Sequence, residues 1–184
     1  MASQNRYIAL LRGINIGKRR VAMADLRAHF ESFGMDNVVT YIQTGNVLFE
    51  SSEQNAATLK TKLEQGLVAK LGYEVPVVLL RPAELRKVVK ENPFSEAEMA
   101  DDVKRYVAFL PQAITENQAK ELRALNVDEE SYYVGESAVY AGFRGPTLDS
   151  QFFGKDLIGK TLGVKPTVRN WKVTNALAEL AESA

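Results

Sequence analysis

Hydrophobic and polar residues follow one another along this chain with two periods, one typical of strands and one typical of helices. Short runs rich in β-branched and aromatic residues predict strands, and longer stretches with apolar residues three or four apart predict helices. In the first half, strands are expected at residues 7–11, 38–43, 47–51 and 75–80, and helices at residues 23–33 and about 54–71. A further helix is expected from Pro82, because proline is favoured at a first helical position.

The second half repeats this succession. Its expected strands are residues 105–110, a hairpin over 131–143 and residues 166–170, and its expected helices are residues 116–125, 149–162 and a last one ending near 182. Residues 6–11 and 105–110 are also alike in sequence, with four of six positions identical. We therefore predict an α+β fold, a tandem duplication of two ferredoxin-like β-α-β-β-α-β halves spanning residues 1–100 and 101–184.

Several predicted strands are apolar on both faces, notably Tyr7–Leu11, Val75–Leu80 and Val107–Leu110. A lone sheet with helices on one side leaves its other face in water, which favours an alternating pattern. The second face is therefore expected to be covered, either by the other half of the chain or by a second copy in a homodimer.

Composition narrows the possible chemistry more than it identifies a function. The 184 residues include 23 basic and 23 acidic side chains, one histidine and no cysteine. This excludes disulfides, thiolate catalysis and metal sites built on sulfur or on several histidines, so we expect no metal and no cofactor. The sequence shows neither an apolar signal segment nor an apolar run of about 18 residues, so a cytoplasmic protein without a membrane partner is expected.

The connection between the first strand and the first helix is the strongest candidate for a ligand site. It is basic, glycine-containing and free of acids, and its candidate ligand-binding residues are Arg12, Gly13, Asn15, Gly17, Lys18, Arg19 and Arg20. Backbone N–H groups at a helix start favour an anion, and nearby cations add to that attraction. The alternative is a solvated connection whose glycines only supply positive φ.

Two observations favour the functional interpretation. The equivalent connection in the second half, residues 111–115, is shorter and uncharged, so the fold itself does not require a basic loop. In a ferredoxin-like sheet the first and third strands are antiparallel neighbours, which places the hairpin turn beside Arg12 and Gly13. The turn residues are then Gln43, Thr44, Gly45 and Asn46, whose alternative role is ordinary turn chemistry.

A second candidate segment is Arg169, Asn170 and Trp171, which stand where the first half is apolar. In a structural interpretation Asn170 is a helix N-cap and Trp171 packs beneath its helix. In the other, Arg169 and Trp171 form a platform of cation and aromatic ring for a ligand.

Three motifs together resemble an uncharacterised bacterial family, domain of unknown function 1697. They are residues 9–15 (ALLRGIN), residues 41–47 (YIQTGNV) and residues 169–171 (RNW), and the similarity extends over nearly the whole chain. Where the family usually has a second glycine near Lys18, a proline at Ala22 and Asn-Thr-Val at residues 172–174, this chain differs. The resemblance implies a two-part α+β fold and no particular activity.

These observations support three hypotheses about function. The first is binding of, or catalysis on, a small anionic ligand such as a nucleotide or phosphorylated metabolite; no catalytic residue can be named, because neither a Ser/His/Asp set nor a carboxylate pair stands out. The second is a single-stranded nucleic-acid binder, for which Tyr7 and Phe49 on the central strands would be the stacking residues. The zero net charge makes nucleic acid the weaker choice. The third is a non-catalytic interaction module.

Overall fold

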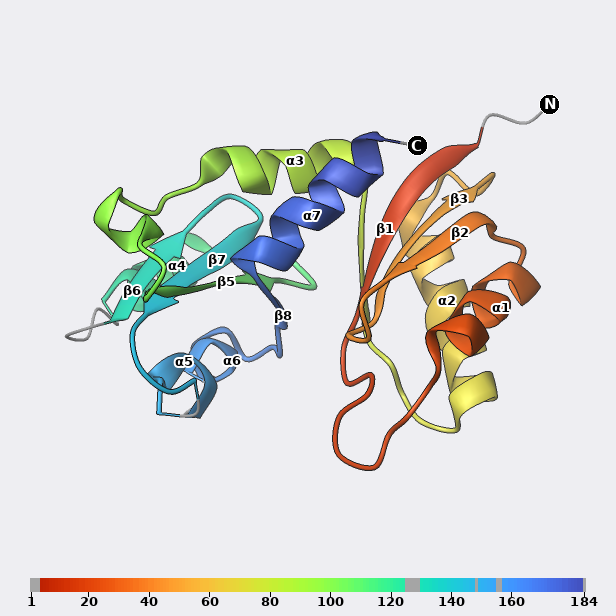
Figure 1. Cartoon of the computed structure of the whole chain (residues 1–184), viewed down its shortest axis with the longest axis horizontal. Coiled ribbons are helices and arrows are strands. Elements are labelled where there is room, and N and C mark those ends of the chain that lie inside the picture. The colour runs from red at the N-terminus through yellow and green to blue at the C-terminus, as the bar shows by residue number, and fades with distance from the viewer. Residues whose placement is uncertain (1–3, 125–129, 148, 155–156, 184) are drawn as a thin grey trace. The chain divides into compact units, whose positions relative to one another are not determined.

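The structure is a computed structural model that describes residues 4–124, 130–147, 149–154 and 157–183. It is a mixed α+β protein with two four-stranded antiparallel sheets, each accompanied by helices (Figure 1). The chain forms two compact units, one of residues up to Leu85 and from Leu177 onward, the other of residues from Arg86 to Ala176. The sequence predicted a boundary at residue 100, whereas this division falls within a helix and assigns the last residues to the first unit.

The first unit contains a sheet with the strand order β2-β3-β1-β4. Its elements are β1 (Asn5–Leu11), α1 (Met23–Ser32), β2 (Asp36–Tyr41), β3 (Asn46–Ser51), α2 (Ala56–Leu71), β4 (Val77–Leu80) and the start of α3 (Pro82–Glu91). Each was expected from the hydrophobic pattern, with bounds that differ by at most two or three residues. The predicted neighbours β1 and β3 are antiparallel partners in the register Leu10 with Asn46.

Helix α2 illustrates how the sequence determines an element. The Asn55 side chain accepts hydrogen bonds from the N–H groups of Ala57 and Thr58, which caps the helix start. Gly72 ends the helix in the left-handed conformation, at φ 77°. Between these ends, leucines four residues apart are fully buried: Leu59, Leu63 and Leu67.

Strand β1 is buried on both faces, as its apolar run predicted. Tyr7, Ala9 and Leu11 belong to the core that α1 and α2 cover. Ile8 on the other face is also fully buried. On that face the Arg6 guanidinium donates a hydrogen bond to the carbonyl oxygen of Ala181, at 3.3 Å. The end of the last helix therefore lies along the second face of this sheet.

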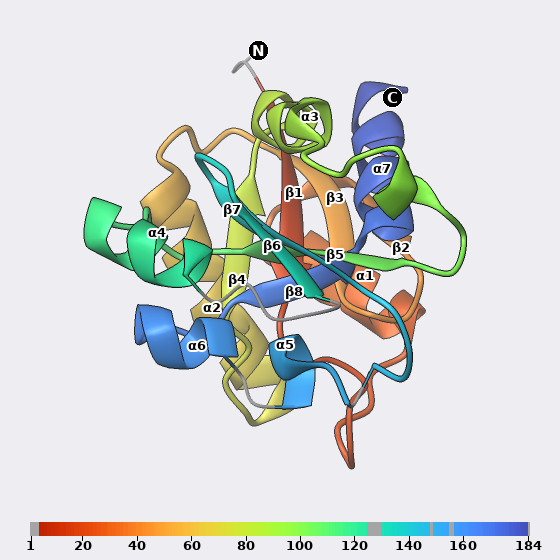
Figure 2. The same ribbon diagram turned by 90° about the vertical axis from the view of Figure 1, so that its left-hand side faces the viewer.

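The second unit has the strand order β6-β7-β5-β8 (Figure 2). Its elements are η1 (Ala97–Met99), β5 (Lys104–Phe109), α4 (Glu116–Arg123), β6 (Glu130–Val134), β7 (Ala138–Phe143), α5 (Gln151–Gly154), α6 (Leu157–Leu162), β8 (Thr167–Asn170) and α7 (Trp171–Glu182). One helix was predicted over residues 149–162. The described residues of this stretch are helical at Gln151–Gly154 and Leu157–Leu162, and residues 155 and 156 lie outside the described ranges.

Candidate functional site

The β2–β3 hairpin turn lies directly beside the end of β1, as the topology predicted. The N–H of Leu11 donates to the carbonyl oxygen of Gly45 at 2.8 Å. Gly45 has φ 76°, and a Cβ there would lie 2.9 Å from the Leu11 Cβ and 3.1 Å from the Ile14 Cβ. Only glycine fits such a close approach, so this residue fixes the distance between the turn and the loop that follows β1.

Asn15 fastens that loop to the turn with its side chain. Its Nδ2 donates to the carbonyl oxygens of Gln43 at 2.9 Å and Val21 at 3.1 Å, and its Oδ1 accepts from the Val21 N–H at 2.9 Å. Asn15 itself has φ 56°, a left-handed conformation that asparagine tolerates better than most residues. The paired bonds to Val21 close residues 16–20 into a separate projecting loop.

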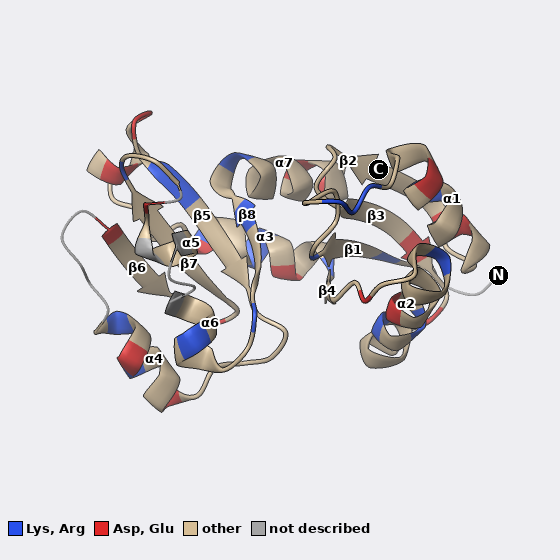
Figure 3. Ribbon diagram, turned by 90° about the horizontal axis from the view of Figure 1, so that it is seen from below, with Lys and Arg blue, Asp and Glu red and all other residues tan. Residues whose placement is uncertain are grey.

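The projecting loop, residues 16–20, carries three exposed cations, Lys18, Arg19 and Arg20. The loop belongs to the connection between β1 and α1, and its lysine and arginine residues are coloured blue in Figure 3. The Arg19 N–H donates to the Ile16 carbonyl oxygen at 3.0 Å, which makes a tight turn around Gly17 at φ 56°. Within the described part of the chain, no carboxylate forms an ion pair with any of these three cations.

Arg19 is held in a defined position. Its guanidinium carbon lies 4.4 Å from the centroid of the Tyr73 ring, a cation–π contact. A Cβ on Gly13, which has φ 81°, would lie 3.0 Å from the Arg19 Nη1, so the arginine side chain passes over that glycine. The Arg19 guanidinium therefore lies against Gly13 and Tyr73 while the residue stays exposed.

Helix α1 begins immediately after this loop without a side-chain cap. Its N-cap is Ala22, whose methyl group accepts no hydrogen bond, so the first N–H groups of the helix have no side-chain acceptor at that residue. The positive end of the helix dipole therefore adds to the charge of the loop. Asp25 in the first turn is the competing anion on the same helix end.

Some side chains of the hairpin turn stabilise the turn itself, and others are exposed to solvent, where a ligand can reach them. Asn46 is fully buried and donates to the Tyr41 carbonyl oxygen at 3.0 Å and to the Thr44 hydroxyl at 2.9 Å, so its side chain holds the turn together. The Gln43 side chain is exposed. Ile42 is unusual, because a β-branched residue at φ 47° is strained and its side chain is 44% exposed.

The second candidate segment lies in the other unit. Arg169 is 8% exposed, and this burial lowers the pKa of its guanidinium to about 10. Asn170 accepts from the Val173 N–H at 2.7 Å and so caps α7. Trp171 is buried with its ring against Phe94, at a centroid distance of 5.4 Å. Asn170 and Trp171 therefore have the roles that the structural interpretation gave them.

The aromatic side chains of the central strands are not accessible for stacking on bases. Tyr7 and Phe49 are 0% and 1% exposed, and their rings stack on each other in the core with centroids 5.8 Å apart. The face of the sheet that carries them is packed against α1 and α2, so these two residues do not favour the alternative of a nucleic-acid binder.

A polar network that the sequence did not reveal joins η1 to β6 in the second unit. Both carboxylate oxygens of Glu98 accept from the Tyr133 hydroxyl at 2.8 Å, and one accepts from the Ser95 N–H at 2.9 Å and hydroxyl at 2.6 Å. Burial raises the pKa of Glu98, but hydrogen bonds from Ser95, Ser131 and Tyr133 outweigh it and lower the pKa to about 2. These hydrogen bonds connect the η1 segment to strand β6, which is a structural role.

Two further properties concern the described residues as a whole. None of their histidine, cysteine, aspartate and glutamate side chains gather in threes with the spacing of a metal site. None of the helices within the described ranges combines the length and apolar character that a membrane crossing requires.

Comparison with known proteins gives a family and a fold. The family model described as "Protein of unknown function (DUF1697)" matches residues 4–140. The solved structure of conserved bacterial protein SP0830 from Streptococcus pneumoniae matches 98% of this chain and 100% of its own, with a TM-score of 0.79 at 22% identity, a likeness of fold alone. An unknown protein from Galdieria sulphuraria covers 91% of this chain and 99% of its own at 14% identity, and its TM-score of 0.30 is too low to support a common fold. No curated protein matches the chain.

Proposed function

The chain belongs to the DUF1697 family of proteins of unknown function, and we propose that it binds a small anionic ligand, such as a nucleotide or a phosphorylated metabolite. The binding site consists of residues 12–20, called the basic loop below, together with the hairpin turn of residues 43–46. The proposal is one of binding, because no nucleophile with a neighbouring base is found among the described residues of this site.

The observation that carries the proposal is the position of Arg19. A surface arginine normally samples many rotamers, and ordering it on a ligand costs conformational entropy. Here the Tyr73 ring, 4.4 Å from the guanidinium carbon, and the bare backbone of Gly13 hold it in place without an acidic partner in the described chain. A fixed and unneutralised guanidinium is suited to bidentate contacts with phosphate or carboxylate.

The surroundings of Arg19 add to this interpretation. Lys18 and Arg20 supply further positive charge, and α1 begins at Met23 after the N-cap residue Ala22, which provides no side-chain cap. The second unit, in contrast, starts α4 with a complete capping box in which Thr115 and Gln118 satisfy the helix end themselves. In the second unit the N–H groups at the start of the helix are thus satisfied by side chains of the same connection. The first unit has no such cap at the start of α1.

We also infer that the two units descend from a duplicated ferredoxin-like ancestor. The support is that the described residues of both have the element order β-α-β-β-α-β, with α5 and α6 of the second unit in the place of α2, and equivalent strand orders. The repeated hexapeptides at residues 6–11 and 105–110 lie in β1 and β5, the equivalent first strands. On this view the basic loop is an addition to one copy.

A thermal-shift screen tests the proposal. The compounds are inorganic phosphate, sulfate, nucleotides and sugar phosphates, and the proteins are wild type and a variant with Arg12, Arg19 and Arg20 changed to alanine. A ligand at a hundred times its dissociation constant should stabilise the fold by about 2.7 kcal/mol. In the matched control, three exposed lysines elsewhere are changed to alanine: Lys62, Lys120 and Lys160. The control therefore loses the same three positive charges as the arginine variant.

We expect at least one compound to raise the melting temperature of wild type and of the lysine control, but not that of the arginine variant. An equal shift in all three proteins would mean that binding occurs elsewhere. No shift with any compound would leave an interaction module as the better hypothesis.

A further inference from the structure

A hollow of about 520 Å³ opens on the first unit next to the basic loop. Its walls are the second half of α2 and the segment that leads into β4: Glu64, Gln65, Val68, Ala69, Glu74, Val75 and Pro76. Most of the exposed lining is apolar, and Val68, which is 40% exposed, is part of it. The volume is within the range of small-molecule sites.

Two contacts join the hollow to the site proposed above. The Arg12 N–H donates to the carbonyl oxygen of Pro76, which lines the hollow, at 3.0 Å. Arg19 lies over the ring of Tyr73, which directly precedes the lining residue Glu74 in the chain. The end of the hollow at Glu74 and Pro76 is therefore joined to the backbone of Arg12 and to the ring on which Arg19 lies.

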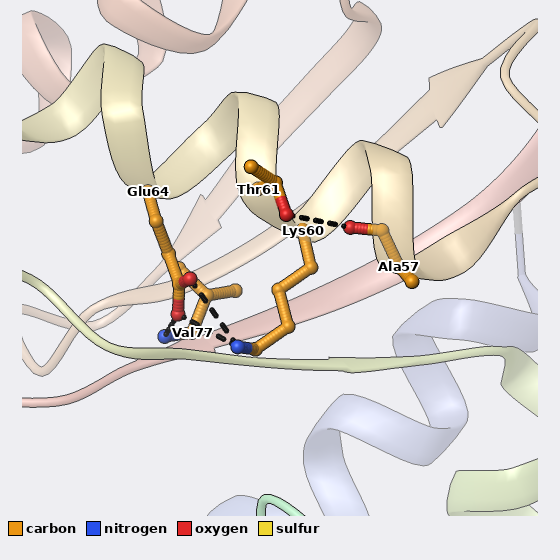
Figure 4. A network of polar contacts seen from close by, with 5 residues as sticks. All are labelled: Ala57, Lys60, Thr61, Glu64 and Val77. Atoms are coloured by element: carbon orange, nitrogen blue, oxygen red, sulfur yellow. Dashed lines mark hydrogen bonds and ion pairs between the residues drawn. The ribbon is translucent and has the colours of Figure 1, made fainter.

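The acids in the hollow determine which part of a ligand can enter it. Glu64 is engaged, since its carboxylate accepts from the Val77 N–H at 2.9 Å and from Lys60 at 3.2 Å (Figure 4). Glu74 is exposed. The charge of Glu64 is balanced by its ion pair with Lys60. The Glu74 carboxylate disfavours an anion within the hollow, whereas the basic loop attracts one at the adjacent edge. A bound anion with an apolar part is thus oriented with its charge toward Arg19 and its apolar part toward Val68.

We propose that the ligand is an anion with an apolar, preferably aromatic, body, held with its charged group at the basic loop and its body in the hollow beside Val68. This inference rests on the proposed function and restricts the ligand class. It favours aryl phosphates, aryl carboxylates and nucleotides over inorganic phosphate and over sugar phosphates, whose hydroxyl-covered bodies gain little from an apolar wall.

Isothermal titration with three probes tests the inference: inorganic phosphate, phenyl phosphate and glucose 6-phosphate. The variants are Val68→Gln, which places a neutral polar group in the hollow, and Ala57→Gln as control. Ala57 is exposed on the same helix eleven residues earlier, about 16 Å away along the axis. Neither substitution alters the net charge, so the attraction of the loop for an anion is preserved.

In wild type and the Ala57→Gln control, phenyl phosphate should bind about tenfold more tightly than the other two probes. In Val68→Gln that preference should largely disappear while inorganic phosphate still binds. Equal affinity of wild type for all three probes, or a preference that survives in Val68→Gln, would overturn the role of the hollow and leave the anion site standing. Failure of every probe to bind wild type would overturn both proposals.

Discussion

The guanidinium of Arg19 lies over the ring of Tyr73, 4.4 Å from its centroid, although 53 residues separate the two in the chain. The contact fixes a cation that would otherwise move freely at the surface. It also joins the loop after β1 to the segment that follows α2, so that two connections of the sheet form one surface.

Two substitutions at Tyr73 separate the ring from the hydroxyl. Tyr73→Leu removes the support of Arg19, and we expect the affinity for phosphate-containing probes to fall about tenfold. Tyr73→Phe keeps the ring and should bind as wild type does. The Tyr73 hydroxyl is buried without a hydrogen-bond partner among the described residues, so Tyr73→Phe should also stabilise the fold by about 1 kcal/mol. Titration calorimetry and urea unfolding measure both effects; equal affinities of the two variants would contradict the account.

Asn15 is expected to be the residue that keeps the loop in place. Asn15→Ala removes three hydrogen bonds and forces alanine to φ 56°, and should cost about 2 kcal/mol or more in the free energy of unfolding. Asn15→Gly loses the same bonds without the backbone strain and should cost about 1 kcal/mol less. Urea unfolding distinguishes them, and identical losses would show that the positive φ carries no cost.

Ile42 is predicted to be a residue whose replacement stabilises the protein. Its side chain is 44% exposed and its φ of 47° disfavours β-branched residues, so Ile42→Asn should add about 1 kcal/mol, or roughly 2–4 °C in melting temperature. Ile16→Asn is the control, because Ile16 is 61% exposed and lacks a positive φ. A stabilisation in both variants would mean that replacing an exposed apolar side chain with a polar one is sufficient, without relief of backbone strain.

The Glu98 network predicts a pH dependence of stability. The pKa of Glu98 is about 2, below its ordinary 4.5, so the unfolded chain binds more protons between these values. Its contribution to stability is therefore fully present above pH 4.5 and is lost as the pH falls through about 2. Tyr133→Phe should raise this pKa by removing one hydrogen-bond donor.

Carboxyl NMR titration of Glu98 measures that change. Tyr132→Phe is the control, because the neighbouring Tyr132 hydroxyl donates to Glu130 and not to Glu98. The same Glu98 midpoint in wild type and Tyr133→Phe would show that the hydroxyl does not lower the pKa of Glu98.

Sequence reasoning predicted the parts of the site that strand topology brings together. Because β1 and β3 are antiparallel neighbours, the loop after Leu11 had to meet the turn before Asn46, and it does. Tyr73 and the hollow beside Val68 were not predicted, because their positions depend on how α2 ends and on side-chain directions. No period or motif in the chain encodes the contact between Arg19 and Tyr73.

Strand registers shift the residue match between the two halves that their sequences suggested. Arg169 pairs with Val107 as Leu80 pairs with Ile8, so a buried arginine does occupy an apolar position of the first unit. By the same register Asn170 corresponds to Arg81, one residue away from the match that the sequences suggested. Strand registers depend on loop lengths and bulges, such as the irregularity between Asp36 and Val39, which short matches do not reveal.

The most direct test of an anion site at the basic loop is a ¹⁵N NMR titration of wild type and Arg19→Ala with phenyl phosphate. We expect saturable shift changes in wild type at residues 12–20 and 43–46, spreading to the segment around Val68 and Pro76. In Arg19→Ala these changes should weaken about tenfold or vanish. Unsaturable or scattered changes in wild type, or the same saturable changes in Arg19→Ala, would contradict this expectation.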